Sequence, residues 1–300
     1  MAKSFKDLLE LAKTRGPKKV SVAVAEDKDV LSAVKVATES KIAEPILVGS
    51  KEKILDIARE IDFDLSNIEI IHEEDKVLAC RIATELVSSG KADVLMKGLI
   101  DTSIIMKQVL DSEIGLRTGN VISHVAVFDV PTYHKVFIVT DAAMNIAPDL
   151  NQKKEIIENA VVLARSLDIE MPKVAVLAAK EKVSPKMEAT VHAKELADMN
   201  KAGEIRDCLV DGPFALDNAI SKESAILKGI NSEVAGDADI LLAPNIDAGN
   251  VLYKCLSFLA NAKSAGLVVG TKAPIVLTSR ADNEEAKLNS IALAVLMASK

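Results

Sequence analysis

Short apolar runs alternate with longer segments of helical spacing along the first hundred residues of this chain. The runs that predict buried strands cover residues 19–25, 43–48, 68–71 and 93–96. Between them, apolar residues recur every three to four positions, which is typical of helices that cover a sheet. Strands separated by connections of helical length predict a parallel sheet.

The pattern changes in the middle of the chain. Two strand-like runs, 121–130 and 136–140, are separated only by a short segment around Pro131-Thr132-Tyr133. A link this short joins antiparallel strands, so the two runs predict a hairpin. We place the first domain boundary just beyond it, near 140–148.

Strand–helix alternation then resumes until the end of the chain. A helix at 152–167 and a strand at 174–178 come first, and Ser184-Pro185 is a favourable helix start for a helix that ends near 202. The later elements are a strand at 207–210, a partly helical segment at 215–228, a strand at 238–243, a helix at 251–262, strands at 266–269 and 275–278, and a helix at 283–299. The whole pattern predicts an α/β fold class: two α/β domains with mostly parallel sheets and an interdomain cleft.

Composition narrows the classes of function. The 300 residues are 49% hydrophobic, and 37 basic against 44 acidic residues give a net charge of -7. A nucleic-acid partner would favour a basic face, and aromatic residues for base stacking amount to only 3%. We therefore expect small-molecule substrates and no nucleic-acid partner.

Targeting and metal signals are missing as well. The three cysteines, Cys80, Cys208 and Cys255, have neither zinc-site nor disulfide spacing. No apolar run reaches the roughly 18 residues of a membrane span, and the first residues form a charged amphipathic helix. We expect a cytoplasmic protein without a membrane partner or a metal site.

Common catalytic motifs are not present either. The chain contains no G-x-G-x-x-G, no G-x-x-x-x-G-K-[ST], no G-x-S-x-G and no H-E-x-x-H. What remains are three polar breaks, each after an apolar run: Asp211–Asp217 (DGPFALD), Pro244–Lys254 (PNIDAGNVLYK) and Thr278–Asp282 (TSRAD). Because open α/β sheets bind ligands at the carboxyl ends of their strands, these loops could converge on one cleft.

The residue types in these breaks suit an anionic substrate. Arg280 could clamp a phosphate or carboxylate with two hydrogen bonds, and Ser279 could donate to an oxygen that gains charge. The Asn250 side chain and the helix amides around it could supply further donors. Taken singly, each feature also fits an ordinary turn, helix cap or solvated charge.

In these three loops the sequence resembles the phosphotransacylase family of phosphate acetyl- and butyryltransferases. Asp211-Gly212-Pro213, then PNIDAGNVLYK, then Ser279-Arg280 occur in the family's order and spacing. The resemblance extends over the whole chain, and the stretch Met96–Asp111 looks like the butyryltransferase branch.

That resemblance implies a fold similar to isocitrate and isopropylmalate dehydrogenases, in which the C-terminal segment returns to the first domain. The expected domains are then 1–140 plus 271–300, and 141–270. It also implies reversible acyl transfer, butanoyl favoured, between coenzyme A and phosphate by direct thiolate attack in a ternary complex. Coenzyme A is a substrate, no cofactor is required, and members are homo-oligomers.

The resemblance also assigns roles to residues. Ser279 acts on the transition state and Arg280 on phosphate. The aspartate that the acetyltransferases use as base falls at Ala286, so Glu285, Glu284 or Asp282 could substitute, and we take Glu285. Lys107 matches a family arginine if one gap is allowed. The substrate-binding residues expected besides Lys107 are Asn245, Asp247, Gly249, Asn250, Lys254, Asp211 and Gly212.

Three alternatives stay open at this point. The acyl group could be acetyl. The same fold also serves metal-dependent decarboxylating dehydrogenases, which need a cluster of aspartates and a nucleotide site. Finally, the alanine at position 286 would fit a non-catalytic protein that binds coenzyme A.

Overall fold

The computed structural model describes residues 3–278 and 283–299 of the chain. Their contacts divide the chain into two compact units. Unit 1 comprises the first five residues and Val121–Ser264, and unit 2 comprises Lys6–Asn120 and Ala265–Lys300. The domain boundaries expected at residues 140 and 270 stay a prediction.

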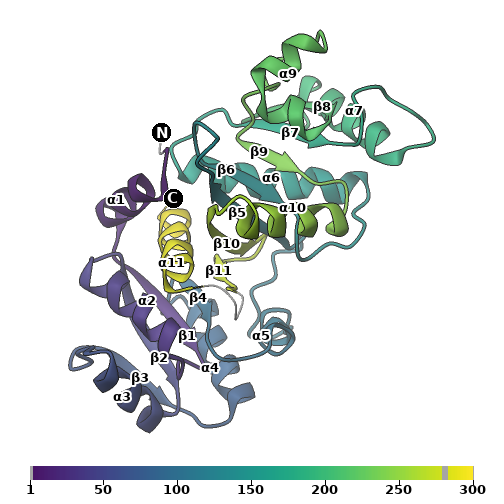
Figure 1. The fold of residues 1–300 in the computed structure, drawn as a ribbon. Helices are drawn as coiled ribbons and strands as arrows, with labels where there is room; N and C mark the ends of the chain where they lie inside the picture. The colour runs from purple at the N-terminus through teal and green to yellow at the C-terminus, as the bar shows by residue number, and fades with distance from the viewer. Residues whose placement is uncertain (1–2, 279–282, 300) are drawn as a thin grey trace. The chain divides into compact units, whose positions relative to one another are not determined.

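Unit 2 is built on a mostly parallel sheet covered by helices (Figure 1). Its strands follow the order β3-β2-β1-β4-β11-β10, and only β10 runs antiparallel to its neighbour β11. The strands are β1 (Lys18–Ala23), β2 (Ala43–Gly49), β3 (Glu69–His72), β4 (Val94–Lys97), β10 (Lys263–Val269) and β11 (Ile275–Val276). The helices are α1 (Phe5–Arg15), α2 (Lys28–Glu39), α3 (Lys51–Glu60), α4 (Lys76–Ser88), α5 (Thr102–Val109) and α11 (Glu284–Ala298).

Aspartates and asparagines start several of these helices soon after a strand ends. Asp27 accepts a hydrogen bond from the Val30 amide at 2.9 Å, and Asp75 accepts from the amides of Val77 and Leu78. Such caps fix where the chain turns from strand to helix, and so they fix the loops at the carboxyl edge of the sheet. The Ala- and Leu-rich α11 is buried around most of its circumference, as expected for a helix without a polar face.

Unit 1 contains five strands of the sheet, in the order β5-β6-β9-β7-β8. Its strands are β5 (Ser123–Asp129), β6 (Phe137–Thr140), β7 (Lys173–Leu177), β8 (Leu209–Phe214) and β9 (Ile240–Leu242). The predicted hairpin is confirmed, because β5 and β6 pair antiparallel, whereas the other neighbours are parallel. The helices are α6 (Leu150–Ser166), α7 (Glu188–Lys201), α8 (Leu216–Ile220), α9 (Lys222–Leu227) and α10 (Ile246–Phe258).

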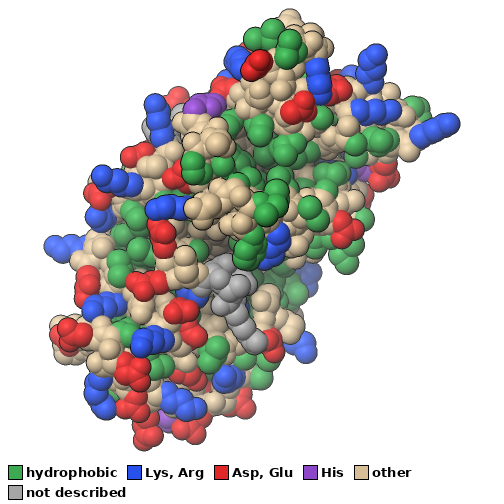
Figure 2. All heavy atoms as spheres, in the orientation of Figure 1, with side chains coloured by type: hydrophobic (Ala, Val, Ile, Leu, Met, Phe, Trp, Pro, Cys, Tyr) green, Lys and Arg blue, Asp and Glu red, His purple; other side chains and the backbone are tan. Residues whose placement is uncertain are grey.

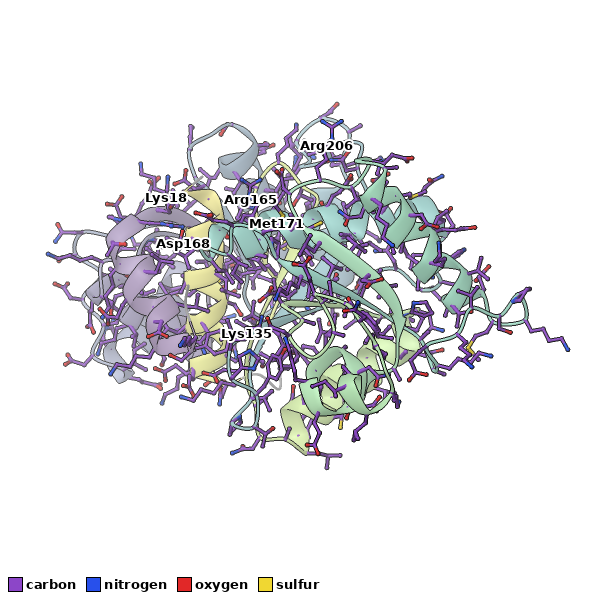
Figure 3. All side chains as sticks on the ribbon, turned by 90° about the horizontal axis from the view of Figure 1, so that it is seen from above. Lys18, Lys135, Arg165, Asp168, Met171 and Arg206 are labelled. Carbon is purple, nitrogen blue, oxygen red and sulfur yellow. The ribbon has the colours of Figure 1, made fainter. Side chains whose placement is uncertain are left out.

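Ion pairs hold the amino ends of the unit 1 strands together. The Lys135 ammonium, buried just before β6 and labelled in Figure 3, lies 2.6 Å from Asp239 and 3.0 Å from Asp237. Asp237 also pairs with Lys173, the first residue of β7, at 2.6 Å. These contacts tie β6, β9 and β7 at one edge, and the opposite carboxyl edge is left for the loops.

Two predicted boundaries are wrong. α7 begins at Glu188 with Met187 as its N-cap, not at Ser184-Pro185. α10 begins at Ile246, five residues before the predicted start at 251, because Asn245 caps it. Among the described helices, none is long and apolar enough to cross a membrane.

Candidate active site

The N-terminus of α10 lies at the carboxyl end of β9 and carries most of the predicted substrate-binding residues. Asn245 has extended backbone angles, and its side chain accepts a hydrogen bond from the Ala248 amide at 3.0 Å. This cap starts the helix inside the PNIDAGNVLYK stretch, so Asp247, Gly249 and Asn250 belong to its first two turns.

Most backbone amides of that first turn already donate hydrogen bonds to other groups of the protein. The Ile246 amide donates to the Ile146 carbonyl at 3.0 Å, and the Gly249 amide donates to the Asn245 carbonyl at 3.1 Å. Within the part of the chain that the structure describes, the Asp247 amide is the first-turn donor without such an acceptor. Of the first-turn amides that we expected to bind an anion, the Asp247 amide is therefore the one that remains able to do so.

Close packing holds this turn against the segment that leaves β6. A Cβ atom at Gly249 would come within 2.3 Å of the Asp141 carbonyl oxygen and 3.0 Å of the Ala142 Cα atom. The Asn250 side-chain amide donates to the Ala142 carbonyl at 3.1 Å. Gly249 and Asn250 thus fix the position of α10, and the Asn250 amide group is already engaged by the protein.

Sequence reasoning missed Asp141, which organises the other half of this arrangement. The buried Asp141 carboxylate accepts hydrogen bonds from the backbone amides of Ala143, Met144 and Asn145 at 2.8, 3.0 and 3.2 Å. The Asn145 side chain adds a fourth at 2.6 Å. The signal was available, since Asp141 is a polar break directly after a strand, but we interpreted the segment only as a domain boundary.

The predicted loop at Asp211 and Gly212 is wrong. Both residues lie inside β8, where Asp211 pairs with Ala175 of β7, and Ala175 in turn pairs with Leu241 of β9. A Cβ atom at Gly212 would come within 2.8 Å of the Val176 carbonyl oxygen, so this glycine allows β8 to pack closely on β7.

Asp211 is therefore not at the strand ends. Through these pairings Asp211 lies level with Leu241, which is three residues, or roughly 10 Å along the strand direction, before Pro244. β7 also lies between β8 and β9 in the sheet. The structure brings Asn245–Asn250 together with Asp141–Asn145, and not with Asp211.

The remaining predicted residues of unit 1 are exposed. Lys254 lies on α10 with its ammonium 5.1 Å from the centre of the Tyr253 ring and 5.8 Å from that of Phe258. Asp247 is exposed in the first turn of the same helix. Cys255 on the same helix is exposed as well.

The catalytic residues predicted for unit 2 are only partly within the described chain. Ser279, Arg280 and Asp282 lie outside the described residues. Glu285 is exposed in the first turn of α11, and Lys107 is exposed in the last turn of α5. Their roles stay a prediction.

A buried charged cluster lies at the carboxyl edge of the unit 2 sheet and was not predicted. It comprises Glu26 after β1, Lys97 at the end of β4, and Cys80 in α4, each at most 8% exposed. Burial raises the pKa of the Cys80 thiol to about 11, with the positive charge of Lys97 opposing the shift and the negative charge of Glu26 adding to it. Since a thiol needs its thiolate form to attack, Cys80 is a poor nucleophile.

The described grooves of unit 2 do not hold these residues. One groove of about 600 Å³ is lined by Lys18, Lys19, Glu44 and Asp93, which lie at the amino ends of the strands. No group of three or more metal-ligating side chains was found among residues 3–278 and 283–299.

The comparisons with known proteins agree with the resemblance seen in the sequence. The family model described as "Phosphate acetyl/butaryl transferase" matches residues 4–78 and 76–295. A phosphate butyryltransferase of Clostridium beijerinckii is 51% identical over 300 residues, which is 100% of this chain and 99% of that protein. A phosphate acetyltransferase of Thermotoga maritima is 48% identical over 291 residues, 97% of this chain and 98% of that protein.

Solved structures extend the comparison to the fold. The structure of a branched-chain phosphotransacylase from Enterococcus faecalis matches with a TM-score of 0.82 and 36% identity, over 94% of this chain and 99% of that one. A 4-hydroxythreonine-4-phosphate dehydrogenase from Burkholderia phymatum shares the fold at a TM-score of 0.59 and 12% identity, over 94% and 98% of the two chains. The expected dehydrogenase-like α/β fold is thereby confirmed, and the chain belongs to the phosphate acetyl/butyryl transferase family.

Proposed function

We propose that this chain is an acyltransferase that moves a short acyl group, butanoyl in preference to acetyl, between coenzyme A and inorganic phosphate. The observation that carries the proposal is the 51% identity to a phosphate butyryltransferase over the whole chain. The acetyl alternative is kept because a phosphate acetyltransferase is 48% identical over a similar length.

The mechanism we propose is direct attack in a ternary complex. The thiolate of coenzyme A attacks the carbonyl carbon of the acyl phosphate, and phosphate leaves. Arg280 holds the phosphate through paired hydrogen bonds, and Ser279 donates to the carbonyl oxygen as it gains charge. Because the attacking thiolate belongs to the substrate, an enzyme nucleophile is not needed, which is consistent with the raised pKa of Cys80.

The same proposal covers the location, the cofactor requirement and the oligomeric state of the enzyme. We infer a cytoplasmic enzyme that requires no metal or redox cofactor and works as a homo-oligomer. The exposed apolar side chains of α10 and of its C-cap residue Leu259 support self-association, since Val251, Phe258 and Leu259 are 69%, 71% and 83% exposed. In Figure 2, hydrophobic side chains gather over this helix.

The test is an assay of purified protein with acyl phosphates of two to six carbons and coenzyme A, with a chelator present. We expect the highest kcat/KM for butanoyl phosphate. Ser279→Ala and Arg280→Ala should each lower turnover by about 10²–10³-fold, as loss of a transition-state hydrogen-bond donor does. Turnover near the wild-type level in both variants would remove Ser279 and Arg280 from the mechanism.

A further inference from the structure

A buried carboxylate in unit 2 has no part in the mechanism described so far. Glu26 follows β1 at the carboxyl edge of the sheet and is only 8% exposed. Its Oε2 atom has no hydrogen-bond partner among the described residues. Folded proteins rarely bury a carboxylate oxygen without a donor, because the lost hydration is not replaced. An exception of this kind at the ligand-binding edge of an α/β sheet indicates a substrate-facing role.

The surrounding backbone leaves room for this carboxylate. Gly49 ends the neighbouring strand β2, and a Cβ atom there would lie 2.1 Å from the Glu26 Oε2 atom. Any other residue at position 49 would displace the carboxylate. The Glu26 carboxylate can therefore occupy this position because the residue at the end of β2 is a glycine.

A positive charge lies in the same cluster. The Lys97 ammonium is 5% exposed and donates to the carbonyls of Gly98 and Ile100 at 3.3 and 3.1 Å. Lys97 and Glu26 both act on the pKa of the Cys80 thiol, in opposite directions, so both charges lie near the same sulfur atom. Two buried groups of opposite charge therefore lie beside one thiol.

Described residues on both sides of the Ser279–Asp282 segment lie at this edge. Before it, Val276 of β11 pairs with Met96, the residue that precedes Lys97. After it, the Lys287 ammonium of α11 lies 3.9 Å from Asp29, three residues beyond Glu26. Glu26 thus lies in the loop after β1, and β1 pairs with β4, the neighbour of the strand that leads into the Ser-Arg motif.

We propose that Glu26 is the general base that accepts the thiol proton of coenzyme A. The proposal rests on the acyl transfer proposed above and supplies the base that Ala286 leaves undefined. The carboxylate takes the proton from sulfur, the sulfur electron pair forms the C–S bond, and the bond between the carbonyl carbon and the phosphate oxygen breaks with its electron pair on phosphate. In reverse, phosphate displaces the thiolate, and Glu26 returns the proton to sulfur.

The alternative bases at the start of α11 are less suited to this role. Glu284 and Glu285 are exposed in the first helical turn, where water competes for their carboxylate oxygens. Glu26 is buried, and its Oε2 atom has no hydrogen-bond partner among the described residues, so this oxygen is left to accept from a substrate thiol.

The experiment compares Glu26→Gln with wild type in the direction from butanoyl phosphate and coenzyme A to butanoyl-CoA, across pH 6 to 10. Loss of a general base should lower kcat by about 10²-fold at pH 7. The deficit should shrink above about pH 8.5, where thiols ionise without help. Glu26→Asp, which keeps a displaced carboxylate, should show a smaller deficit with the same pH dependence, and it serves as the readout if the glutamine variant does not fold.

Matched variants separate the outcomes. Glu52→Gln, an exposed carboxylate on α3 of the same unit, should behave as wild type. A deficit in Glu26→Gln that is equal at every pH, or no deficit, would overturn the assignment, as would a pH-dependent deficit in Glu285→Gln instead. An inactive wild type with every acyl phosphate would instead refute the proposed function, so the two failures are distinguishable.

Discussion

At the scale of single residues, Gly249 fixes the geometry of the α10 N-terminus. An added methyl group would lie 2.3 Å from the Asp141 carbonyl oxygen, far inside van der Waals contact. Gly249→Ala should therefore push α10 from the β6 exit and lower the free energy of unfolding by about 1–3 kcal/mol, the usual cost of overpacking. Chemical denaturation measures this change.

The control for that variant is Ala248→Ser, because the neighbouring Ala248 side chain is exposed. It should change the free energy of unfolding by less than about 0.5 kcal/mol. Equal stability of Gly249→Ala and Ala248→Ser would contradict the close packing described for this turn.

Single residues also show where sequence reasoning stops. Asn245 and Gly249 are recognisable in the sequence because cap and turn chemistry is local. Glu26 is not, since nothing in the run AVAEDKD tells that its carboxylate is buried beside Gly49, a residue 23 positions away. Asp141 was missed for a different reason: its four hydrogen bonds come from residues at most four positions further on, but we interpreted this segment only as a domain boundary.

At the scale of elements, the ion-pair cluster at the amino ends of β6, β7 and β9 predicts a pH dependence of stability. Burial works to raise the pKa of the Asp237 carboxyl, but hydrogen bonds from Lys173 and Lys135 outweigh it and hold the pKa well below its ordinary value. A depressed folded-state pKa stabilises the fold above the unfolded pKa of about 4. That contribution is lost as the pH falls from there through the folded pKa.

Asp237→Asn should therefore lower the free energy of unfolding by about 1–3 kcal/mol at pH 7, where it removes partners of two lysines. The gap between wild type and variant should narrow below about pH 4, because the Asp237 carboxyl takes up a proton in the unfolded state before it does so in the folded state. Asp198→Asn, which breaks an exposed pair with Lys194 on α7, is the control and should cost less than about 1 kcal/mol. A gap for Asp237→Asn that is constant from pH 7 to 3 would speak against the cluster.

The elements themselves were largely predictable. The strand–helix alternation and the β5–β6 hairpin could be predicted because the spacing of apolar residues is a local property of the sequence. The full length of β8 was not predictable. Asp211, Gly212 and Pro213 are residue types typical of a turn, but the pairing of β8 with β7 continues past Asp211. Pairing between distant segments overrides local turn propensity.

At the scale of the whole molecule, we expect α10 to form the contact surface of the proposed oligomer. Phe258 is 71% exposed on this helix, and an acidic residue there would place a charge in an apolar contact. We expect wild type to sediment as an oligomer and Phe258→Asp to shift toward the monomer.

Leu227→Asp on α9 is the matched control, since Leu227 is also exposed, at 79%, but lies on another helix. It should leave the oligomer intact. A monomeric wild type, or equal dissociation of both variants, would exclude α10 as the contact surface.

The most direct test of the whole account is the release of free thiol from butanoyl-CoA by the purified chain at varied phosphate concentration, without added metal. Thiol is expected to appear together with butanoyl phosphate, in equal amounts and at a rate that saturates with phosphate. Thiol release that does not depend on phosphate would indicate hydrolysis instead, and no release would contradict acyl transfer altogether.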